Sequence, residues 1–207
     1  MIQGLYSALS AVSASFDNSS IISGNIANSL SVGYKSKYSV LSDLSSGGVK
    51  VLSVKNNSET GYFVSTGNKL DLAINGEGYF KLSTDDGERF TRMGNFYLDK
   101  NGDMVSADGG RLTEDLNIKN NDSFSIDLNG NILKNGENVG KIDIYNKNGE
   151  KIPQGGYEIM SGFLEASNVD MAREIVNSIV NMRFFQANIK SVQTSDQMLG
   201  YILDIKS

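Results

Sequence analysis

The sequence contains no cysteine, no histidine and no tryptophan, and it has a single proline among its 207 residues. Because cysteine is absent, the chain can form no disulfide, no thiolate metal site and no cysteine nucleophile. Because histidine is absent, the chain lacks the usual general base near neutral pH, the commonest zinc ligand and any Ser-His-Asp arrangement. These absences remove much of enzyme chemistry, so we expect no catalytic residues, no bound metal and no cofactor.

The charge balance and the short apolar runs of the sequence each argue against one class of partner. The chain has 19 Lys and Arg against 24 Asp and Glu, a net charge of -5, and its basic residues are scattered. A surface that follows a phosphate backbone needs clustered basic residues, so no nucleic-acid partner is expected. No segment approaches the ~18 continuous apolar residues of a membrane-spanning helix, so no membrane insertion is expected.

Two segments with regularly spaced apolar residues stand at the ends of the chain. Their steps of three and four residues predict helices over about residues 3–27 and 169–203, each with a narrow apolar stripe. The first stripe contains Leu5, Leu9, Val12, Phe16 and Ile26. The second stripe contains Ile175, Met182, Phe185, Ile189, Val192, Leu199 and Leu203. Because narrow stripes suit helix partners, the two helices are expected to pair like a coiled coil.

Between these ends the apolar spacing changes from the period of a helix to the period of a strand. Leu70, Leu72 and Ile74 alternate with less apolar residues, and Gly follows Asn or Asp at short intervals along the middle of the chain. Such turn glycines are typical of hairpins. The pattern predicts an antiparallel β-rich unit over residues 61–160, in which the glycines at 75–78 form a tight hairpin turn.

The expected fold class is therefore α+β, with four segments along the chain. These are an N-terminal helix (1–30), a connector rich in Ser and Asn (31–60), a β-rich domain (61–160) and a C-terminal helix (161–207).

Three sets of residues in the β-rich segment were candidates for chemistry. Residues 99–103 offer oxygens at alternate positions, but they lack the later glycine and glutamate of a calcium loop, so a β-turn is expected. Residues 76–78 lack the third glycine of a dinucleotide-binding loop. The carboxylates of Asp85, Asp86 and Glu88 leave one alternative function open, an exported carbohydrate-binding or carbohydrate-processing β module with helical arms.

The apolar stripes favour assembly over a purely internal role. Burial of five stripe side chains stabilises the N-terminal helix by on the order of 8–15 kcal/mol. Ordering ~25 residues costs at least ~1 kcal/mol for each residue. Neighbouring copies can supply the missing packing, and a head-to-tail contact that does not close into a ring builds a helical polymer. We therefore expect the residues of both stripes to form an assembly interface between copies.

Four segments, in order along the chain, carry a resemblance to a known family. They are NIANSLSVGYK (25–35), TGNKLDLAINGEGYF (66–80), FTRMGNF with the residues up to Gly109 (90–109), and GFLEASNVD with the following helix (from 162). On these segments the chain resembles the axial proteins of the bacterial flagellum, in particular the rod proteins of the basal body.

The resemblance implies a fold, a function and a set of partners. The terminal helices would form an inner tube with the β-rich domain outside it, in a structural subunit that polymerises helically and transmits torque from motor to hook. The partners would be copies of the chain, other flagellar rod and hook proteins and the flagellar export apparatus. The location would be the flagellar basal body, where the rod crosses the periplasm. The flagellar hook protein is the alternative within this class.

The resemblance also gives a role to the turn that follows the first helix. In the family this motif ends the tube helix and directs the chain outward. Its residues here are Asn25, Ala27, Asn28, Gly33, Tyr34 and Lys35. Gly33 is suited to a positive φ, and Asn28 is suited to a C-terminal cap.

Overall fold

The computed structural model describes residues 2–45, 47–112 and 123–204, apart from the side chains of residues 2 and 202–204. The chain forms a helical unit and a strand-rich unit. The helical unit comprises residues 1–29, 35–58 and 169–207, and the strand-rich unit comprises residues 30–34 and 59–168. Helices at both ends with strands between them confirm the α+β prediction.

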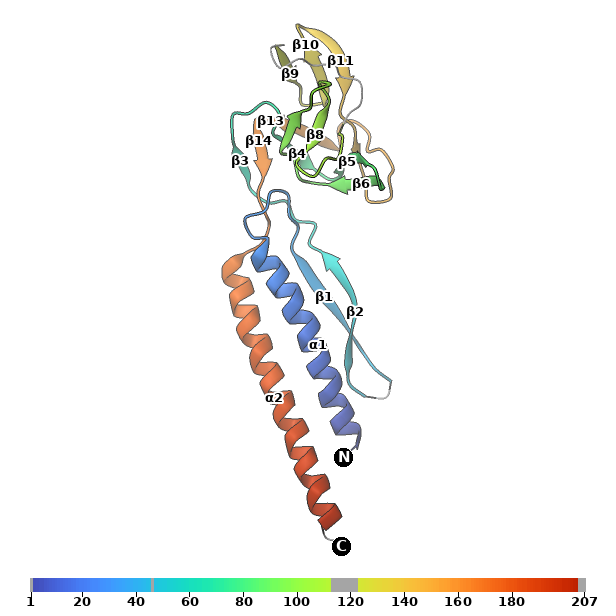
Figure 1. Cartoon of the computed structure of the whole chain (residues 1–207), viewed down its shortest axis with the longest axis vertical. Helices are drawn as coiled ribbons and strands as arrows, with labels where there is room; N and C mark the ends of the chain where they lie inside the picture. Colours follow the sequence, from blue (N-terminus) through green and yellow to red (C-terminus); the bar gives the residue numbers. More distant parts are fainter. Residues whose placement is uncertain (1, 46, 113–122, 205–207) are drawn as a thin grey trace. The chain divides into compact units, whose positions relative to one another are not determined.

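The helical unit contains two antiparallel helices and a β-hairpin (Figure 1). The helices are α1 (Ile2–Ala27) and α2 (Met171–Asp204), and the strands are β1 (Lys37–Asp43) and β2 (Val49–Asn56). α1 lies between α2 and the hairpin and contacts both. Both helices begin and end within two residues of the bounds that the apolar spacing predicts.

The hairpin is the main difference from the predicted organisation. Residues 37–56 form β1, β2 and their turn, whereas the Ser- and Asn-rich composition of 31–60 predicted a semi-ordered connector. Val49, Val51 and Ser53 are half-buried and alternate with exposed residues, which is the period of a strand. Composition was therefore a poor guide to the structure of this segment.

Polar contacts hold the hairpin on α1. The backbone N–H of Val49 donates to Ser10 Oγ at 3.1 Å, and Ser39 Oγ donates to Asn18 Oδ1 at 3.1 Å. Gly48 has a φ of 106°, and a Cβ at this position would lie 2.2 Å from Ser10 Oγ. Glycine therefore allows both the turn and its close approach to the helix.

The strand-rich unit consists of short strands that pair antiparallel within its described residues. The strands are β3 (Phe63–Ser65), β4 (Leu72–Gly76), β5 (Tyr79–Thr84), β6 (Gly87–Thr91), β7 (Phe96–Leu98), β8 (Met104–Ser106), β9 (Phe124–Ile126), β10 (Asn131–Lys134), β11 (Glu137–Lys141), β12 (Ile144–Tyr145), β13 (Tyr157–Ser161) and β14 (Phe163–Glu165). The pairings are β12-β5-β6, β11-β10-β9, β13-β4, β14-β3 and β7-β8. The predicted antiparallel β-rich middle is thus confirmed.

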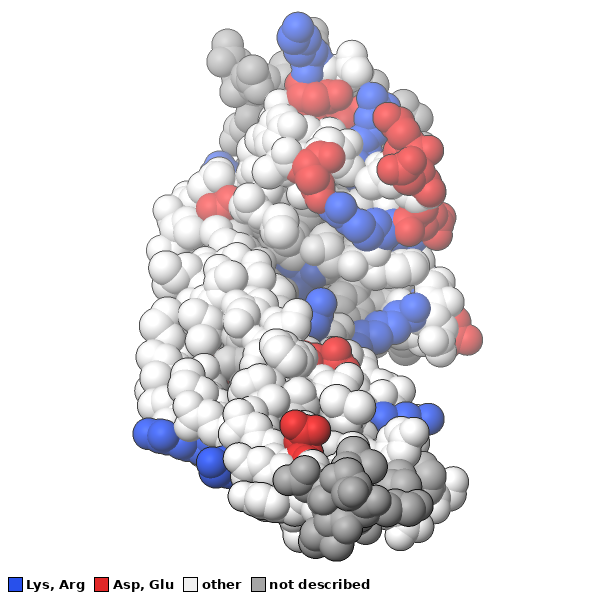
Figure 2. Space-filling model, turned by 60° about the horizontal axis from the view of Figure 1, so that its bottom comes forward, with Lys and Arg blue, Asp and Glu red and all other residues white. Residues whose placement is uncertain are grey.

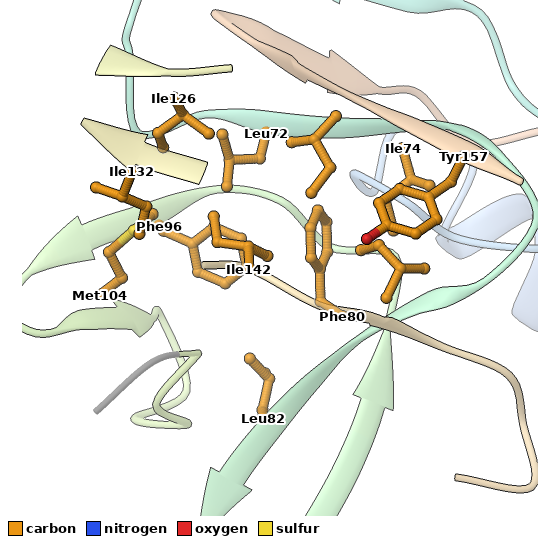
Figure 3. Packing of buried hydrophobic residues seen from close by; sticks show 12 residues of the cluster. Leu72, Ile74, Phe80, Leu82, Phe96, Met104, Ile126, Ile132, Ile142 and Tyr157 are labelled. Carbon is orange, nitrogen blue, oxygen red and sulfur yellow. The ribbon is translucent and has the colours of Figure 1, made fainter. Parts of the chain in front are cut away.

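An apolar cluster forms the core of the described part of the strand-rich unit (Figure 3). Phe80 and Phe96 lie at its centre with ring centroids 5.3 Å apart and ring planes at 89°, an edge-to-face contact. Leu72 and Ile74 of β4 and Ile144 of β12 are almost completely buried around them. Each such side chain stabilises the fold by roughly 1.5–3 kcal/mol, so this cluster is the main source of the unit's stability.

The predicted hairpin turn at residues 75–78 is wrong. β4, which ends at Gly76, pairs with β13, whereas β5, which begins at Tyr79, pairs with β6 and β12. Gly76 and Gly78 have φ values of 121° and 114°. A Cβ at Gly78 would lie 2.3 Å from Ile144 Cγ2. These glycines therefore serve close packing where the chain passes from one strand pairing to another.

Three loops of the strand-rich unit share one pattern of hydrogen bonds. They are residues 99–103, 127–131 and 146–150. In each loop the side-chain oxygen of the first residue accepts from the backbone N–H groups of the third and fifth residues. The fourth residue is a glycine with a positive φ. The Asp99 loop is therefore a turn between β7 and β8, as predicted, and its carboxylate is used within the turn.

Hydrogen bonds lower the pKa of Asp127 in the second of these loops. Burial acts to raise the pKa, but hydrogen bonds from the Asn131 side chain and from the backbone N–H groups of Asn131 and Asn129 outweigh it. A carboxyl group with a pKa lowered by folding stabilises the protein above its unfolded pKa. That contribution is lost as the pH falls through the folded pKa.

We therefore expect Asp127→Asn to lessen the loss of stability in acid. Asn146 makes the same two backbone hydrogen bonds with an amide oxygen, so the loop should keep its shape. Urea midpoints measured at pH 7 and below about pH 4 should differ less for this variant than for the wild type. Asp86→Asn, which removes a carboxylate from another turn, is the control. An unchanged pH dependence in Asp127→Asn would contradict the role given to its carboxylate.

Candidate assembly interface

Small side chains form most of the buried face of α1. The buried residues of this helix include Ala8, Ala11, Ala14 and Ser15, together with Val12, Ile22 and Asn25. Small side chains allow a shorter distance between packed elements, and the hairpin approaches α1 closely at Gly48.

Two contacts fix the register of α1 against α2. Phe16 and Phe185 pack edge to face, with ring centroids 5.1 Å apart and ring planes at 76°. The buried Asn181 side chain donates to the Ser15 carbonyl at 2.9 Å and to Ser19 Oγ at 2.7 Å. Any other register would leave this buried amide without partners, so it acts as a polar register marker within the helix pair.

The predicted stripe of α1 does not form one buried seam. Val12 is buried and Leu5 and Ile26 are half-buried, but Leu9 and Phe16 are exposed. The small residues beside the stripe occupy the contact face, so the large side chains lie at its edges. Leu9 and most of the Phe16 surface remain free for a partner outside the chain.

The predicted stripe of α2 divides into an inner and an outer part. The inner part consists of Phe185, Ile189, Val192 and Leu199, which are half-buried. Phe185, Val192 and Leu199 recur every seven residues, so they lie on the face of α2 that contacts Phe16 of α1.

The outer part of the stripe remains on the surface of α2. Ile175 and Met182 are 48% and 54% exposed, and Ile179, which lies between them, is 54% exposed. The side chain of Leu203 lies outside the described residues. We call Ile175, Ile179 and Met182 the outer ridge. The part of Ile175 and Met182 in assembly stays a prediction, and Ile179 was not among the predicted residues.

An apolar groove of about 520 Å³ lies within the helical unit, between α1, α2 and the hairpin. Its lining includes Ala14, Ile21 and Ile22 of α1, Tyr38, Leu41 and Val49 of the hairpin, and Asn177, Val180 and Phe184 of α2. Its charged lining residues are Lys37 and Glu174, which have opposite signs. Sequence patterns did not predict this groove, because the hairpin that forms one of its walls was not predicted.

Asn25 of the turn motif joins three elements of the helical unit. Its side-chain amide donates to the Lys37 carbonyl at 2.8 Å, and its oxygen accepts from the Lys37 N–H at 2.8 Å. The same amide donates to Glu174 Oε1 at 3.2 Å. Asn25 is 1% exposed, so these bonds tie the end of α1 to β1 and α2 away from water.

We expect Asn25→Ala to lower the free energy of unfolding by about 1–3 kcal/mol, because the Lys37 N–H and C=O groups lose their shared partner. Thermal unfolding of the full-length chain, followed by circular dichroism at a helical wavelength, measures this effect. Asn28→Ala is the matched control and should cost less, because the Gly24 carbonyl keeps the backbone N–H of residue 28 as a donor. Equal losses of unfolding free energy in Asn25→Ala and Asn28→Ala would contradict the role given to the Asn25 side chain.

The remaining motif residues lie at the end of α1 and just beyond it. Ala27 is the last residue of α1 and is exposed. The Asn28 backbone N–H and side-chain amide both donate to the Gly24 carbonyl, at 3.2 and 2.8 Å, so Asn28 caps the helix as expected. Tyr34 is half-buried and Lys35 is buried.

Gly33 has the positive φ that the motif predicted, at 65°. A Cβ at this position would lie 2.4 Å from the carbonyl carbon of Arg92, so the close approach also requires glycine. The Gly33 N–H donates to the backbone carbonyl of Glu165 at 2.7 Å. Within the strand-rich unit, Gly33 therefore docks the segment that follows α1.

A buried ion pair beside Gly33 was not predicted from the sequence. Arg92 Nη1 and Glu165 Oε2 lie 3.1 Å apart, and their side chains are 5% and 1% exposed. Arg92 also donates to the carbonyls of Ile74 and Gly76, and Glu165 Oε1 accepts from the Gly61 N–H at 3.1 Å. The pair thereby connects β4, β14 and the segment before β3.

The carboxylates considered for a carbohydrate site lie on an exposed turn. Asp85, Asp86 and Glu88 are exposed around the turn between β5 and β6, and Glu88 pairs with Lys81 at 2.8 Å. Within the described ranges, no three His, Cys, Asp or Glu residues are grouped so that they could hold a metal ion. None of the helices in that part of the chain is long and apolar enough to cross a membrane.

Two family models of known proteins match parts of the chain. The family model "Flagellar basal body rod FlgEFG protein C-terminal" matches residues 160–205, which contain α2. The model "Flagellar hook protein FlgE/F/G D1 domain" matches residues 73–134 of the strand-rich unit.

Similar proteins cover the chain from end to end. The flagellar basal-body rod protein FlgG of Bacillus subtilis (strain 168) is 31% identical over the whole of both chains. FlgG of Buchnera aphidicola subsp. Acyrthosiphon pisum is 29% identical over 96% of this chain and 98% of its own. The rod protein FlgF of Mesorhizobium japonicum is 29% identical over 90% of both chains. The first alignment spans 266 positions, so this chain of 207 residues lacks segments that the relative has.

Proposed function

Because the chain belongs to the family of flagellar basal-body rod proteins, we propose that it polymerises helically into the rod through α1 and α2. As a member of this family it is a structural subunit of the flagellar basal body. The relatives are named as rod proteins, which favours the rod over the hook. In this proposal the polymer transmits torque from motor to hook, and the flagellar export apparatus delivers the subunit.

The observation that best supports this proposal is the sparsely charged, apolar surface that the two helices give the helical unit. α1 contains one charged residue, Asp17, and Arg183 is the one charge between Ile175 and Ile189 of α2. Figure 2 shows this unit as largely white, with few Lys, Arg, Asp or Glu side chains on the visible face. An exposed surface of this kind is typical of a contact with another protein. Repetition of one such contact between copies builds a polymer.

Assembly of the purified full-length chain tests the proposal. We expect a concentration series to show a critical concentration above which rod-shaped polymers sediment and are visible by electron microscopy. The circular dichroism spectrum should show folded helices both below and above that concentration. A folded chain that stays monomeric over the whole series would contradict the proposal.

A carbohydrate-directed function is the remaining candidate from another class. It requires the carboxylates of Asp85, Asp86 and Glu88, whereas the rod proposal gives them no part in assembly. The triple variant Asp85→Asn, Asp86→Asn and Glu88→Gln should therefore polymerise at the wild-type critical concentration. Loss of function in this variant with normal polymers would favour the carbohydrate module.

A further inference from the structure

The outer ridge and the groove lie on opposite sides of α2. Successive residues of an α-helix are turned by ~100° about its axis. Ile175 and Met182 therefore lie roughly 140–180° around the helix from Val180 and Phe184, which line the groove. Ile179 lies roughly 100–140° from the same two residues. One face of the helical unit thus has an apolar ridge, and the other face has an apolar groove.

The groove and the ridge match in chemistry. The lining of the groove has two charged side chains, Lys37 and Glu174, whose charges cancel. A nucleic acid, an anionic lipid surface or a strongly charged peptide would find no net charge there to bind. An uncharged apolar helix face suits it, and the outer ridge is such a face.

We propose that the outer ridge of one copy, formed by Ile175, Ile179 and Met182, inserts into the groove between α2 and the β1–β2 hairpin of the next copy. This inference rests on the proposed rod polymer and names its contact surfaces. Because the ridge and the groove occupy different faces, the contact is heterologous. Two joined copies therefore leave one ridge and one groove free to bind further copies. Such a contact repeats without closing into a dimer.

The proposal also gives the hairpin a function. Leu41, Tyr38 and Val49 form one wall of the groove, and the hairpin is held on α1 by the contacts of Ser10 and Asn18. A wall fixed before assembly reduces the entropy cost of binding the ridge. Residues that were expected to form a connector thus become one wall of the binding surface.

A charge-exchange experiment tests this contact. Ile179→Glu puts a carboxylate on the ridge, and Leu41→Lys puts an ammonium group in the groove wall. Each variant alone would have to bury an unpaired charge, so its critical concentration should rise at least about tenfold. In an equal mixture, the changed ridge of Ile179→Glu can bind the changed groove of Leu41→Lys, so that the two charges pair. The native ridge of Leu41→Lys can bind the native groove of Ile179→Glu, so the two variants alternate along the polymer. The mixture should therefore assemble near the wild-type concentration.

Val176→Glu is the matched control, because Val176 is 58% exposed on α2 but belongs to neither surface. It should assemble like the wild type, and circular dichroism should show that all three variants keep their helices. The inference is wrong if the mixture fails to assemble, if the single variants assemble normally, or if Val176→Glu is equally defective. Failure of the wild type itself to polymerise would instead contradict the proposed function.

Discussion

Replacement of Glu165 by Ala should lower the free energy of unfolding by about 3–5 kcal/mol, because it leaves the buried Arg92 guanidinium without its counter-charge. The substitution also removes the acceptor for the Gly61 N–H. Urea unfolding of the full-length chain, followed by the near-ultraviolet signal of its tyrosines, measures the change.

A second variant separates the cost of an unpaired charge from the cost of a lost contact. Arg92→Met combined with Glu165→Ala removes both charges. The double variant should therefore lose less free energy of unfolding than the sum of the losses in the two single variants. Arg89→Met is the control, because Arg89 is a partly exposed arginine of β6 paired with Asp108. Surface pairs of this kind contribute about 0–1 kcal/mol. Additive effects at Arg92 and Glu165 would contradict the coupling.

Leu199→Asp should abolish polymerisation at concentrations where the wild type assembles. Leu199 is half-buried on the α2 face that also carries Phe185 and Val192. The part of its side chain that stays exposed is available to a neighbouring copy, and loss of an apolar contact there costs roughly 1.5–3 kcal/mol, which corresponds to about a tenfold to hundredfold rise in critical concentration. Sedimentation over a concentration series gives this value directly.

The strand-rich unit should be unaffected by Leu199→Asp, because its apolar core contains no residue of α2. Its tyrosine signal and its urea transition should match those of the wild type. Thr194→Asp introduces the same charge at an exposed position of α2 and should leave assembly unchanged. Wild-type polymers formed by Leu199→Asp would show that the inner part of the stripe does not contribute to assembly.

The sequence predicts the two helices well but misplaces part of their contact face. Long runs with three-and-four spacing set the bounds of α1 and α2, since few other structures satisfy that period. The apolar stripes followed the largest side chains, whereas Ala8, Ser15 and Asn181 form much of the contact. Large apolar side chains dominate a hydropathy pattern because they gain the most free energy from burial. Close helix packing depends on small residues, which give only a weak signal in such a pattern.

Local sequence patterns did not predict contacts between residues that are distant in the sequence. Arg92 and Glu165 are 73 positions apart, and both lie inside the segments that carry the family resemblance. Their pairing depends on where β14 and the segment after β6 meet, which local periodicity does not encode. The hairpin was missed for a different reason. Burial alternates along Val49, Val51 and Ser53, but Ser53 is polar and the exposed Leu52 is apolar, so the hydropathy of the sequence does not show this alternation.

Hydrogen exchange of backbone amides in the monomer and in the polymer, read by mass spectrometry, tests most directly whether the helical unit carries the contacts between copies. We expect assembly to slow exchange in peptides from residues 171–184 and 37–56, and to leave the core strands β4, β5 and β12 unchanged. Slower exchange confined to the strand-rich unit, with α2 and the hairpin exchanging equally in both forms, would contradict the account.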